Sequence, residues 1–230
     1  MISTLNLLFL FQVLHSTGTG DILFIDDFSS GTLESNWIIY GDPQPFIMEN
    51  LGNPAPCFNN NGDAMYGSGA VSREVFSIEN GLVLESDMYI SCSERGAWVS
   101  GVIGFSESGF RGTNSPDTRT LATLSFLYCG EMDWQKPHLQ CVLLFHCQQD
   151  DETIFTRELL HMNQYLDDWH RFRLELTEDR RVHFFINDSL LISTSSCIPD
   201  SIETVRVFLG DRSSDWGIAL HDNLIVYREN

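Results

Sequence analysis

Apolar and polar residues alternate along much of the chain, with the period of two that is typical of β-strands. Phe172, Leu174 and Leu176 are separated by single charged residues, so an extended backbone would place all three on one buried face. A helix would distribute the same side chains around its circumference. The alternation recurs over 82–90 and 205–209. The pattern therefore predicts half-buried strands in all three segments.

Longer apolar stretches at 121–128 and 141–145 are rich in strand-favouring residues and are bounded by turn residues. Clusters such as 59–62 and 114–117 supply turns at the short spacings of a sandwich rather than of βαβ units. No stretch of ten or more residues has a helical period, and 159–166 has room for one helical turn at most. We therefore predict an all-β chain of about a dozen strands, arranged as a two-sheet antiparallel sandwich.

The first 20 residues contain no Asp, Glu, Lys or Arg and include an apolar run at 5–14 that is followed by small residues. This pattern is typical of a signal peptide, although only the initiator amine supplies positive charge before the run. Spanning a bilayer takes about 18 or more apolar residues. We predict a signal peptide over 1–20, one β-sandwich domain over 21–230, no membrane insertion, and an extracytoplasmic or secreted location.

The chain carries 32 Asp and Glu against 13 Lys and Arg, which gives a formal charge of -19. Such a field repels phosphate backbones and anionic lipid headgroups, so nucleic acid is not an expected partner. It is compatible with cations and neutral ligands. Solubility through self-repulsion is the simpler explanation of the same charge.

Six cysteines allow three disulfides in an exported protein, among fifteen possible pairings. Cys129 and Cys141 flank a predicted hairpin loop, where they would either face each other across two strands or remain buried thiols. No pair has the C-x-x-C spacing of a zinc site. The sequence therefore leaves the pairing open among Cys57, Cys92, Cys129, Cys141, Cys147 and Cys197.

The segments 168–176 and 182–192, which contain Asp168-Trp169-His170, resemble the hairpin signature of concanavalin A-like and laminin G-like modules. In those modules a Trp-His pair opens one strand and a tight turn follows the next. Asn187-Asp188 supplies residues that tolerate positive φ at that turn. The ends of the chain, 26–31 and 221–227, are also similar to that superfamily. The resemblance covers about residues 22–227 and implies a jelly-roll sandwich of the concanavalin A-like type; it bears on fold more than on function.

The segment Glu131-Met132-Asp133-Trp134-Gln135 is similar to the Glu-x-Asp-x-Glu active-site strand of laminarinase-like glycoside hydrolases on this fold. In that family the first Glu is the nucleophile and the last is the acid/base. Gln135 occupies the last position here, and an amide cannot deliver a proton to a leaving sugar oxygen. Glu131 and Asp133 are therefore weak catalytic candidates, and Glu-x-Asp also arises by chance in an acidic chain.

An unbroken last strand would place Asp222 on one face with Leu220 and Leu224. An ionised carboxylate in an apolar row needs a cation or hydrogen-bond donors. The alternative is a bulge near His221, which would turn Asp222 outward to solvent or to backbone N–H groups.

Asp26 is likewise in phase with Phe24 and Phe28 in the predicted first strand. The resemblance implies that the first and last strands are neighbours and that a structural Ca²⁺ ion binds between them. The predicted metal ligands are Asp26 or Asp27 together with Asp222. Backbone carbonyls and water would complete the roughly six to eight oxygens that calcium takes.

Tryptophan offers flat apolar faces of the kind on which sugar rings stack. Trp37 and Trp169 stand at predicted strand starts and resemble buried positions of the superfamily. Trp134 and Trp216 lie in predicted loops, so these two are the candidate ligand-binding residues.

Together these features favour a non-catalytic, carbohydrate-binding or adhesion-like module whose partner is a glycan or a protein surface. One alternative is a glycoside hydrolase or lyase with Glu131 and Asp133 as the first candidates. Another is a structural or protein-interaction domain whose exposed sheet edges meet other proteins.

Overall fold

The computed structural model describes residues 20–41, 44–49, 56–59, 68–92, 97–109, 120–129, 142–149, 152–159, 161–210 and 217–229. These ranges contain sixteen β-strands and one 3-10 turn, Asn163–Tyr165, but no α-helix. The all-β prediction is confirmed, and the one helical turn falls inside the segment 159–166. Nothing in the described ranges is a helix long and apolar enough to cross a membrane.

The strands form two sheets in which every described pairing is antiparallel, as predicted. Sheet A has the order β14 (Ser189–Ser193), β13 (Val182–Ile186), β12 (Trp169–Leu176), β7 (Leu82–Cys92), β16 (Gly217–Arg228), β4 (Pro56–Asn59) and β3 (Phe46–Glu49), with β1 (Asp21–Asp26) also pairing with β16. Sheet B has the order β11 (Glu152–Leu159), β10 (Val142–Gln149), β9 (Thr120–Cys129), β8 (Ala97–Glu107), β15 (Thr204–Gly210), β5 (Ser68–Ser72) and β2 (Trp37–Gly41), with β6 (Phe76–Ser77) also pairing with β15.

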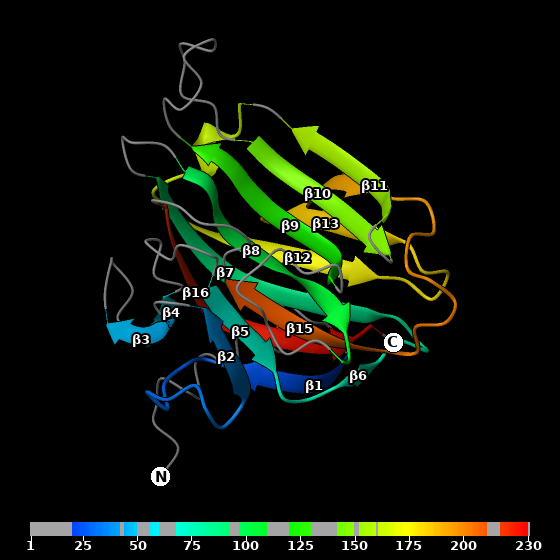
Figure 1. Ribbon diagram of the computed structural model, residues 1–230, viewed down its shortest axis with the longest axis horizontal. Coiled ribbons are helices and arrows are strands. Elements are labelled where there is room, and N and C mark those ends of the chain that lie inside the picture. Colours follow the sequence, from blue (N-terminus) through cyan, green and yellow to red (C-terminus); the bar gives the residue numbers. More distant parts are fainter. Residues whose placement is uncertain are drawn as a thin grey trace.

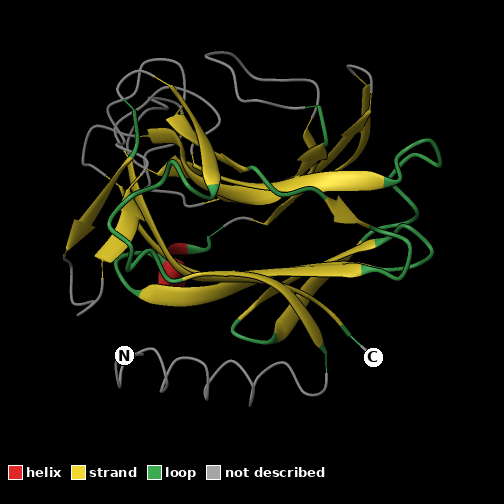
Figure 2. Ribbon diagram, turned by 90° about the horizontal axis from the view of Figure 1, so that it is seen from below, coloured by secondary structure: helices red, strands yellow, loops and turns green. Residues whose placement is uncertain are grey.

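The two sheets face each other as the layers of a sandwich (Figure 2). In Figure 1 sheet B lies in front, and β12, β7 and β16 run behind it. The first and last strands, β1 and β16, are paired from Asp21 opposite Arg228 to Asp26 opposite Leu224. The neighbour relation that the resemblance implied is therefore confirmed.

The core between the layers follows from the alternation in the sequence. Phe172, Leu174 and Leu176 on β12 are at most 1% exposed, whereas the residues between them are half-buried. From sheet B, Phe145 meets Phe184 of sheet A with ring centroids 4.9 Å apart. Each large apolar side chain buried in this way contributes roughly 1.5–3 kcal/mol.

The hairpin between β13 and β14 has the turn that the sequence predicted. Asn187 and Asp188 adopt φ values of 49° and 63°. Two consecutive positive φ angles give a turn whose twist matches that of the flanking strands. Asn187 also accepts a hydrogen bond from the backbone N–H of Arg171 through Oδ1, at 3.1 Å, so the turn is tied to β12.

The predicted hairpin around 129–141 is confirmed in its strands, because β9 and β10 pair with Leu127 opposite Val142. Cys141 lies outside the described residues, as does the side chain of Cys129, so both alternatives for these two cysteines stay open.

Candidate functional site

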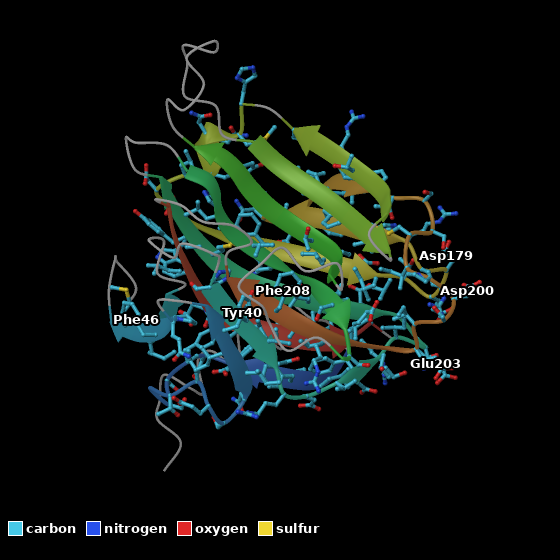
Figure 3. The ribbon with its side chains drawn as sticks, viewed as in Figure 1. Tyr40, Phe46, Asp179, Asp200, Glu203 and Phe208 are labelled. Carbon is cyan, nitrogen blue, oxygen red and sulfur yellow. The ribbon has the colours of Figure 1, made fainter. Side chains whose placement is uncertain are left out.

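The outer face of sheet B carries aromatic rings laid over glycines. A Cβ on Gly69 would lie 2.6 Å from the hydroxyl of Tyr40, and one on Gly104 would lie 2.8 Å from the ring of Phe208. Glycine at these two positions therefore lets each ring lie close to the sheet. Tyr40 is half-buried, Phe208 is 2% exposed, and both are labelled on the face turned to the viewer in Figure 3. Of these two rings, Tyr40 is the more accessible to a ligand.

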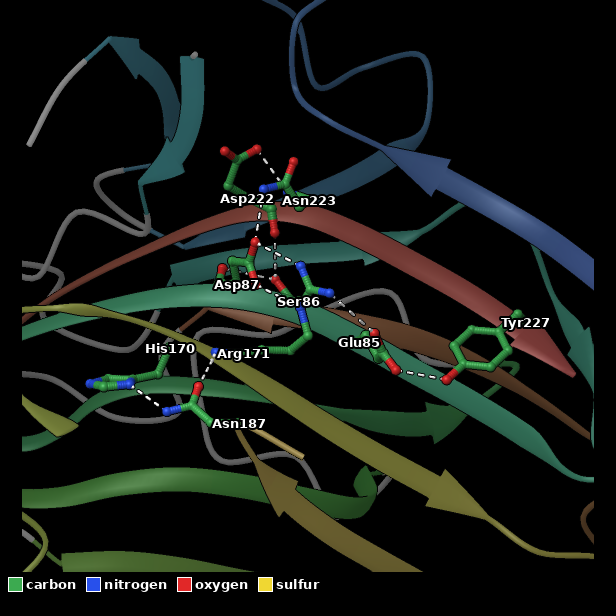
Figure 4. Close-up of polar contacts among 9 residues, drawn as sticks. All are labelled: Glu85, Ser86, Asp87, His170, Arg171, Asn187, Asp222, Asn223 and Tyr227. Carbon is green, nitrogen blue, oxygen red and sulfur yellow. Dashed lines mark hydrogen bonds and ion pairs between the residues drawn. The ribbon is translucent and has the colours of Figure 1, made fainter. Parts of the chain in front are cut away.

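A cluster of charged and amide side chains lies on the outer face of sheet A (Figure 4). Arg171 of β12 contacts Asp87 of β7 through two hydrogen bonds, Nε to Oδ1 at 2.9 Å and an Nη to Oδ2 at 3.2 Å. The side-chain amide of Asn223 on β16 donates to the same Oδ2 at 2.8 Å. One carboxylate thus connects three adjacent strands, and bidentate pairs of this kind are stronger than single hydrogen bonds.

Glu85 lies two residues before Asp87 on the same face and is 3% exposed. The hydroxyl of Tyr227 donates to its Oε1 at 2.7 Å, and a guanidinium nitrogen of Arg171 lies 4.0 Å from its Oε2. Burial raises the pKa of Glu85, and the hydrogen bond from Tyr227 opposes that shift. Burial and the neighbouring charge of Glu85 raise the pKa of Tyr227.

These contacts give the cluster a structural role in joining β7, β12 and β16. The oxygens of Asp87 already accept three N–H donors, which leaves that carboxylate poorly placed to act as a nucleophile or base. Sequence reasoning missed the cluster. Its signal was present, because Glu85 and Asp87 are in phase with each other within 82–90 and Arg171 opens the next alternating segment.

Asp222 does not share a face with Leu224, because β16 does not run unbroken. The register against β7 shifts between Asp222, opposite Asp87, and Ile225, opposite Glu85. Two residues therefore stand opposite Ser86, and the bulge reverses the alternation of β16. Asp222 faces outward with Asp87, its Oδ1 accepts the backbone N–H of Asn223 at 2.7 Å, and it is 2% exposed. The bulge considered as an alternative is the observed geometry.

Asp26 is buried at the end of β1 and is surrounded by donors. Its Oδ1 accepts the backbone N–H of Phe28 at 2.8 Å, and its Oδ2 accepts Asn36 Nδ2 at 3.0 Å and Trp37 Nε1 at 2.7 Å. Trp37 opens β2 of sheet B and is fully buried, as predicted. Asp26 thus connects the two sheets. The neighbouring Asp27 is half-buried and accepts hydrogen bonds from the N–H and hydroxyl of Ser29.

The structure does not bring Asp26 and Asp222 together. Asp26 points into the sandwich toward Trp37, whereas Asp222 lies on the outer face of sheet A. Within the described ranges, no group of three or more His, Cys, Asp or Glu residues is arranged to hold a metal ion. Asp26 and Asp222 are therefore not placed as ligands of one ion, and the alternative, Asp27 with Asp222, stays a prediction.

The other candidates lie where the structure gives no description. Glu131, Asp133, Trp134 and Gln135 belong to the segment that connects β9 with β10, and Trp216 directly precedes β16; all five are outside the described residues. Trp169 opens β12 as predicted but is half-buried rather than buried, with its ring centroid 5.8 Å from that of Tyr89.

No protein-family model matches the chain, and no curated protein matches it in sequence. Its fold, however, matches solved structures along nearly the whole length. The carbohydrate recognition domain of Emp47p superposes with a TM-score of 0.61 at 6% identity, covering 91% of this chain and 98% of that one. LamAcat from Zobellia galactanivorans superposes with a TM-score of 0.56 at 12% identity, covering 93% and 99%.

The protein has the concanavalin A-like fold. The resemblance carried by the Trp169-His170 hairpin and by the two chain ends is therefore confirmed. A third structure of this fold, the potassium-bound form of the Emp46p carbohydrate recognition domain, has a TM-score of 0.59 at 10% identity and covers 88% of this chain and 94% of that one. At these identities the likeness establishes the concanavalin A-like architecture and leaves the ligand to other evidence.

Proposed function

We propose that this chain is a non-catalytic, extracytoplasmic carbohydrate-binding domain. The observation that carries the proposal is the end-to-end likeness to two domains described as carbohydrate recognition domains, those of Emp47p and Emp46p, with more than nine tenths of each covered. The charge of -19 agrees with a neutral ligand and disfavours a polyanion.

The residues proposed for sugar stacking are Tyr40, Trp134 and Trp216. Tyr40 is a partly exposed aromatic ring on the outer face of sheet B, where it lies over Gly69. Trp134 and Trp216 are candidates on sequence grounds. Sugar sites combine such rings with a few placed polar groups.

Glycan-array binding of residues 21–230 tests the proposal, with Tyr40→Ala, Trp134→Ala and Trp216→Ala alongside the parent chain. The matched control is Phe46→Ala, because Phe46 is an aromatic ring on sheet A that is 46% exposed and has no part in the proposed site. We expect selective binding to one glycan class, a loss of at least about tenfold in one or more of the first three variants, and no change in the control.

A blank array would overturn the proposal and favour a structural or protein-binding role. Release of reducing sugar from a bound glycan, abolished by Glu131→Gln or Asp133→Asn, would replace it with the hydrolase alternative.

A further inference from the structure

A cysteine of sheet B and a cysteine of the segment that connects β14 with β15 meet inside the core. The Sγ atoms of Cys147 and Cys197 lie 2.8 Å apart. Cys147 is fully buried and Cys197 is 2% exposed, and both belong to the main hydrophobic cluster. The structure records both as thiols, yet their separation exceeds a disulfide bond length of about 2.05 Å by less than 1 Å.

Each cysteine is fixed by the backbone of its own element. Cys147 lies on β10, opposite Ala122 of β9 and Phe155 of β11. Cys197 lies beyond β14, where its N–H donates to the carbonyl of Arg180 at 2.9 Å. The hydroxyl of Thr194 lies 3.4 Å from the Cys197 sulfur and also accepts the N–H of Val182 at 2.9 Å. The two sulfur atoms therefore meet because the strands and turns around them are in place.

We propose that Cys147 and Cys197 form a disulfide that ties β10 of sheet B to the segment that follows β14, the edge strand of sheet A. Cys147 belongs to β10, the strand next to the β11 edge of sheet B, and Cys197 follows β14, the edge strand of sheet A. Near this end of the sandwich, the layers otherwise meet through side-chain packing such as that of Phe145 on Phe184. Among the described residues no third metal-binding side chain accompanies the two thiols, so a zinc site does not compete.

The bond forms by exchange with an external disulfide such as oxidised glutathione. The thiolate of one cysteine attacks that disulfide and releases one thiol; the second cysteine then attacks the mixed disulfide and releases the other. Two protein thiols are oxidised and one disulfide is reduced to two thiols. Because both sulfur atoms are buried in the folded chain, the exchange takes place before the core closes.

Peptide mapping tests the pairing directly. The full chain is expressed in an oxidising compartment, its free thiols are alkylated under denaturing conditions, and it is digested with chymotrypsin without reduction. Cleavage after aromatic residues isolates Cys147 in 146–155, and cleavage after Leu191 and Phe208 isolates Cys197 in 192–208. We expect these two peptides as one linked species that reduction separates. Two singly alkylated peptides, or a link from either cysteine to another partner, would overturn the proposal.

Thermal unfolding of Cys147→Ser, Cys197→Ser and the double variant distinguishes a bond from thiol packing. A disulfide that closes a loop of about 50 residues raises Tm on the order of 10 °C in a chain of this size. We expect each single variant to lose about as much as the double variant, since either one removes the whole bond. Losses that add, in protein purified from an oxidising compartment, would mean that the sulfur atoms only pack. Glycan binding is a separate readout, because the disulfide does not depend on the proposed function.

Discussion

His221 lies on β16 with its imidazole fully buried, opposite Met88 of the core. Burial disfavours the charged ring and lowers its pKa from 6.5 to about 3. The folded protein therefore keeps this histidine neutral in mildly acidic solution, whereas the unfolded chain protonates it near pH 6.5. The unfolded state binds more protons between these two values, so this residue makes stability fall as the pH drops below about 6.5.

Lowering the pH from 7 to 5 should remove about 2 kcal/mol of stability through His221 alone, as follows from its folded-state pKa of about 3. Urea unfolding at both pH values gives the loss of unfolding free energy between pH 7 and pH 5 for the parent chain and for His221→Leu. The difference between these two losses is the contribution of His221. We expect the pH-dependent loss to be about 2 kcal/mol smaller in the variant, whatever its stability at pH 7.

His161→Asn is the matched control, because His161 is exposed and Asn tolerates its φ of 62°. It should leave the pH-dependent loss unchanged. Equal losses in the parent and in His221→Leu would mean that His221 is protonated at little cost in the folded state.

For Asp26, the sequence predicted burial but not the hydrogen-bond partners. Its phase with Phe24 and Phe28 predicted a buried carboxylate in need of partners, and Asp26 is buried, at 7% exposure. The partners themselves, Asn36 and Trp37, lie ten and eleven residues further on. Alternation along one strand contains no information about donors supplied by another element, so cation and N–H donors could not be distinguished.

Among the elements, β16 is divided by its bulge into two halves with opposite phase. Asn223 adopts φ 49° there, and its amide donates to Asp87 Oδ2 at 2.8 Å. Asn is one of the few residues apart from Gly that tolerate this conformation. The bulge therefore depends on Asn223 in two ways, through its backbone and through its side chain.

Comparing Asn223→Gly with Asn223→Ala separates the two contributions. Glycine keeps the positive φ and loses the hydrogen bond to a carboxylate, which should cost about 1–2 kcal/mol of unfolding free energy. Alanine adds the left-handed strain and should cost about 1–2 kcal/mol more. Denaturant unfolding measures both. If alanine were no worse than glycine, the backbone conformation at 223 would not contribute to the stability of the bulge.

The contrast between β12 and β16 explains which elements the sequence predicts. In β12 the alternation is strict, and Asn187-Asp188 mark the turn of the neighbouring hairpin between β13 and β14, so both were predicted correctly. In β16 the apolar residues Leu220 and Leu224 fit an unbroken strand equally well, and nothing local marks the extra residue opposite Ser86. A bulge changes the face of every later residue, so one missed position left Asp222 on the face opposite to that of Leu224 and Val226.

At the scale of the whole molecule, the two-sheet architecture was predictable because period-two patterning recurs along the chain and the Trp-His hairpin at 168–192 resembles that of concanavalin A-like modules. The candidate site was less predictable, because sites combine residues that are remote in sequence. Arg171 and Asp87 are 84 positions apart and Asp87 and Asn223 are 136 apart. Cys147 and Cys197, at 50 positions, were one of fifteen possible pairs until the sandwich brought them together.

The positions of Asp26 and Asp222 predict whether calcium changes the Tm of the protein. Calcium at a free concentration 100 times its Kd would add about 2.7 kcal/mol to the free energy of unfolding, which is roughly 5–10 °C in Tm. Since Asp26 is occupied by three N–H donors and Asp222 lies on the other face of sheet A, we expect the Tm in calcium and in excess chelator to agree within about 1 °C.

Thermal unfolding of Asp26→Asn and Asp27→Asn, with and without calcium, tests whether either carboxylate binds the ion. Asp26→Asn should lower Tm by the same amount with and without calcium, because the variant replaces an acceptor of three hydrogen bonds. Asp27→Asn should have little effect on Tm, because the hydrogen bonds of Asp27 are local to Ser29. A Tm that falls in chelator for the parent chain but not for Asp26→Asn would instead make Asp26 a metal ligand and restore the site that the sequence predicted.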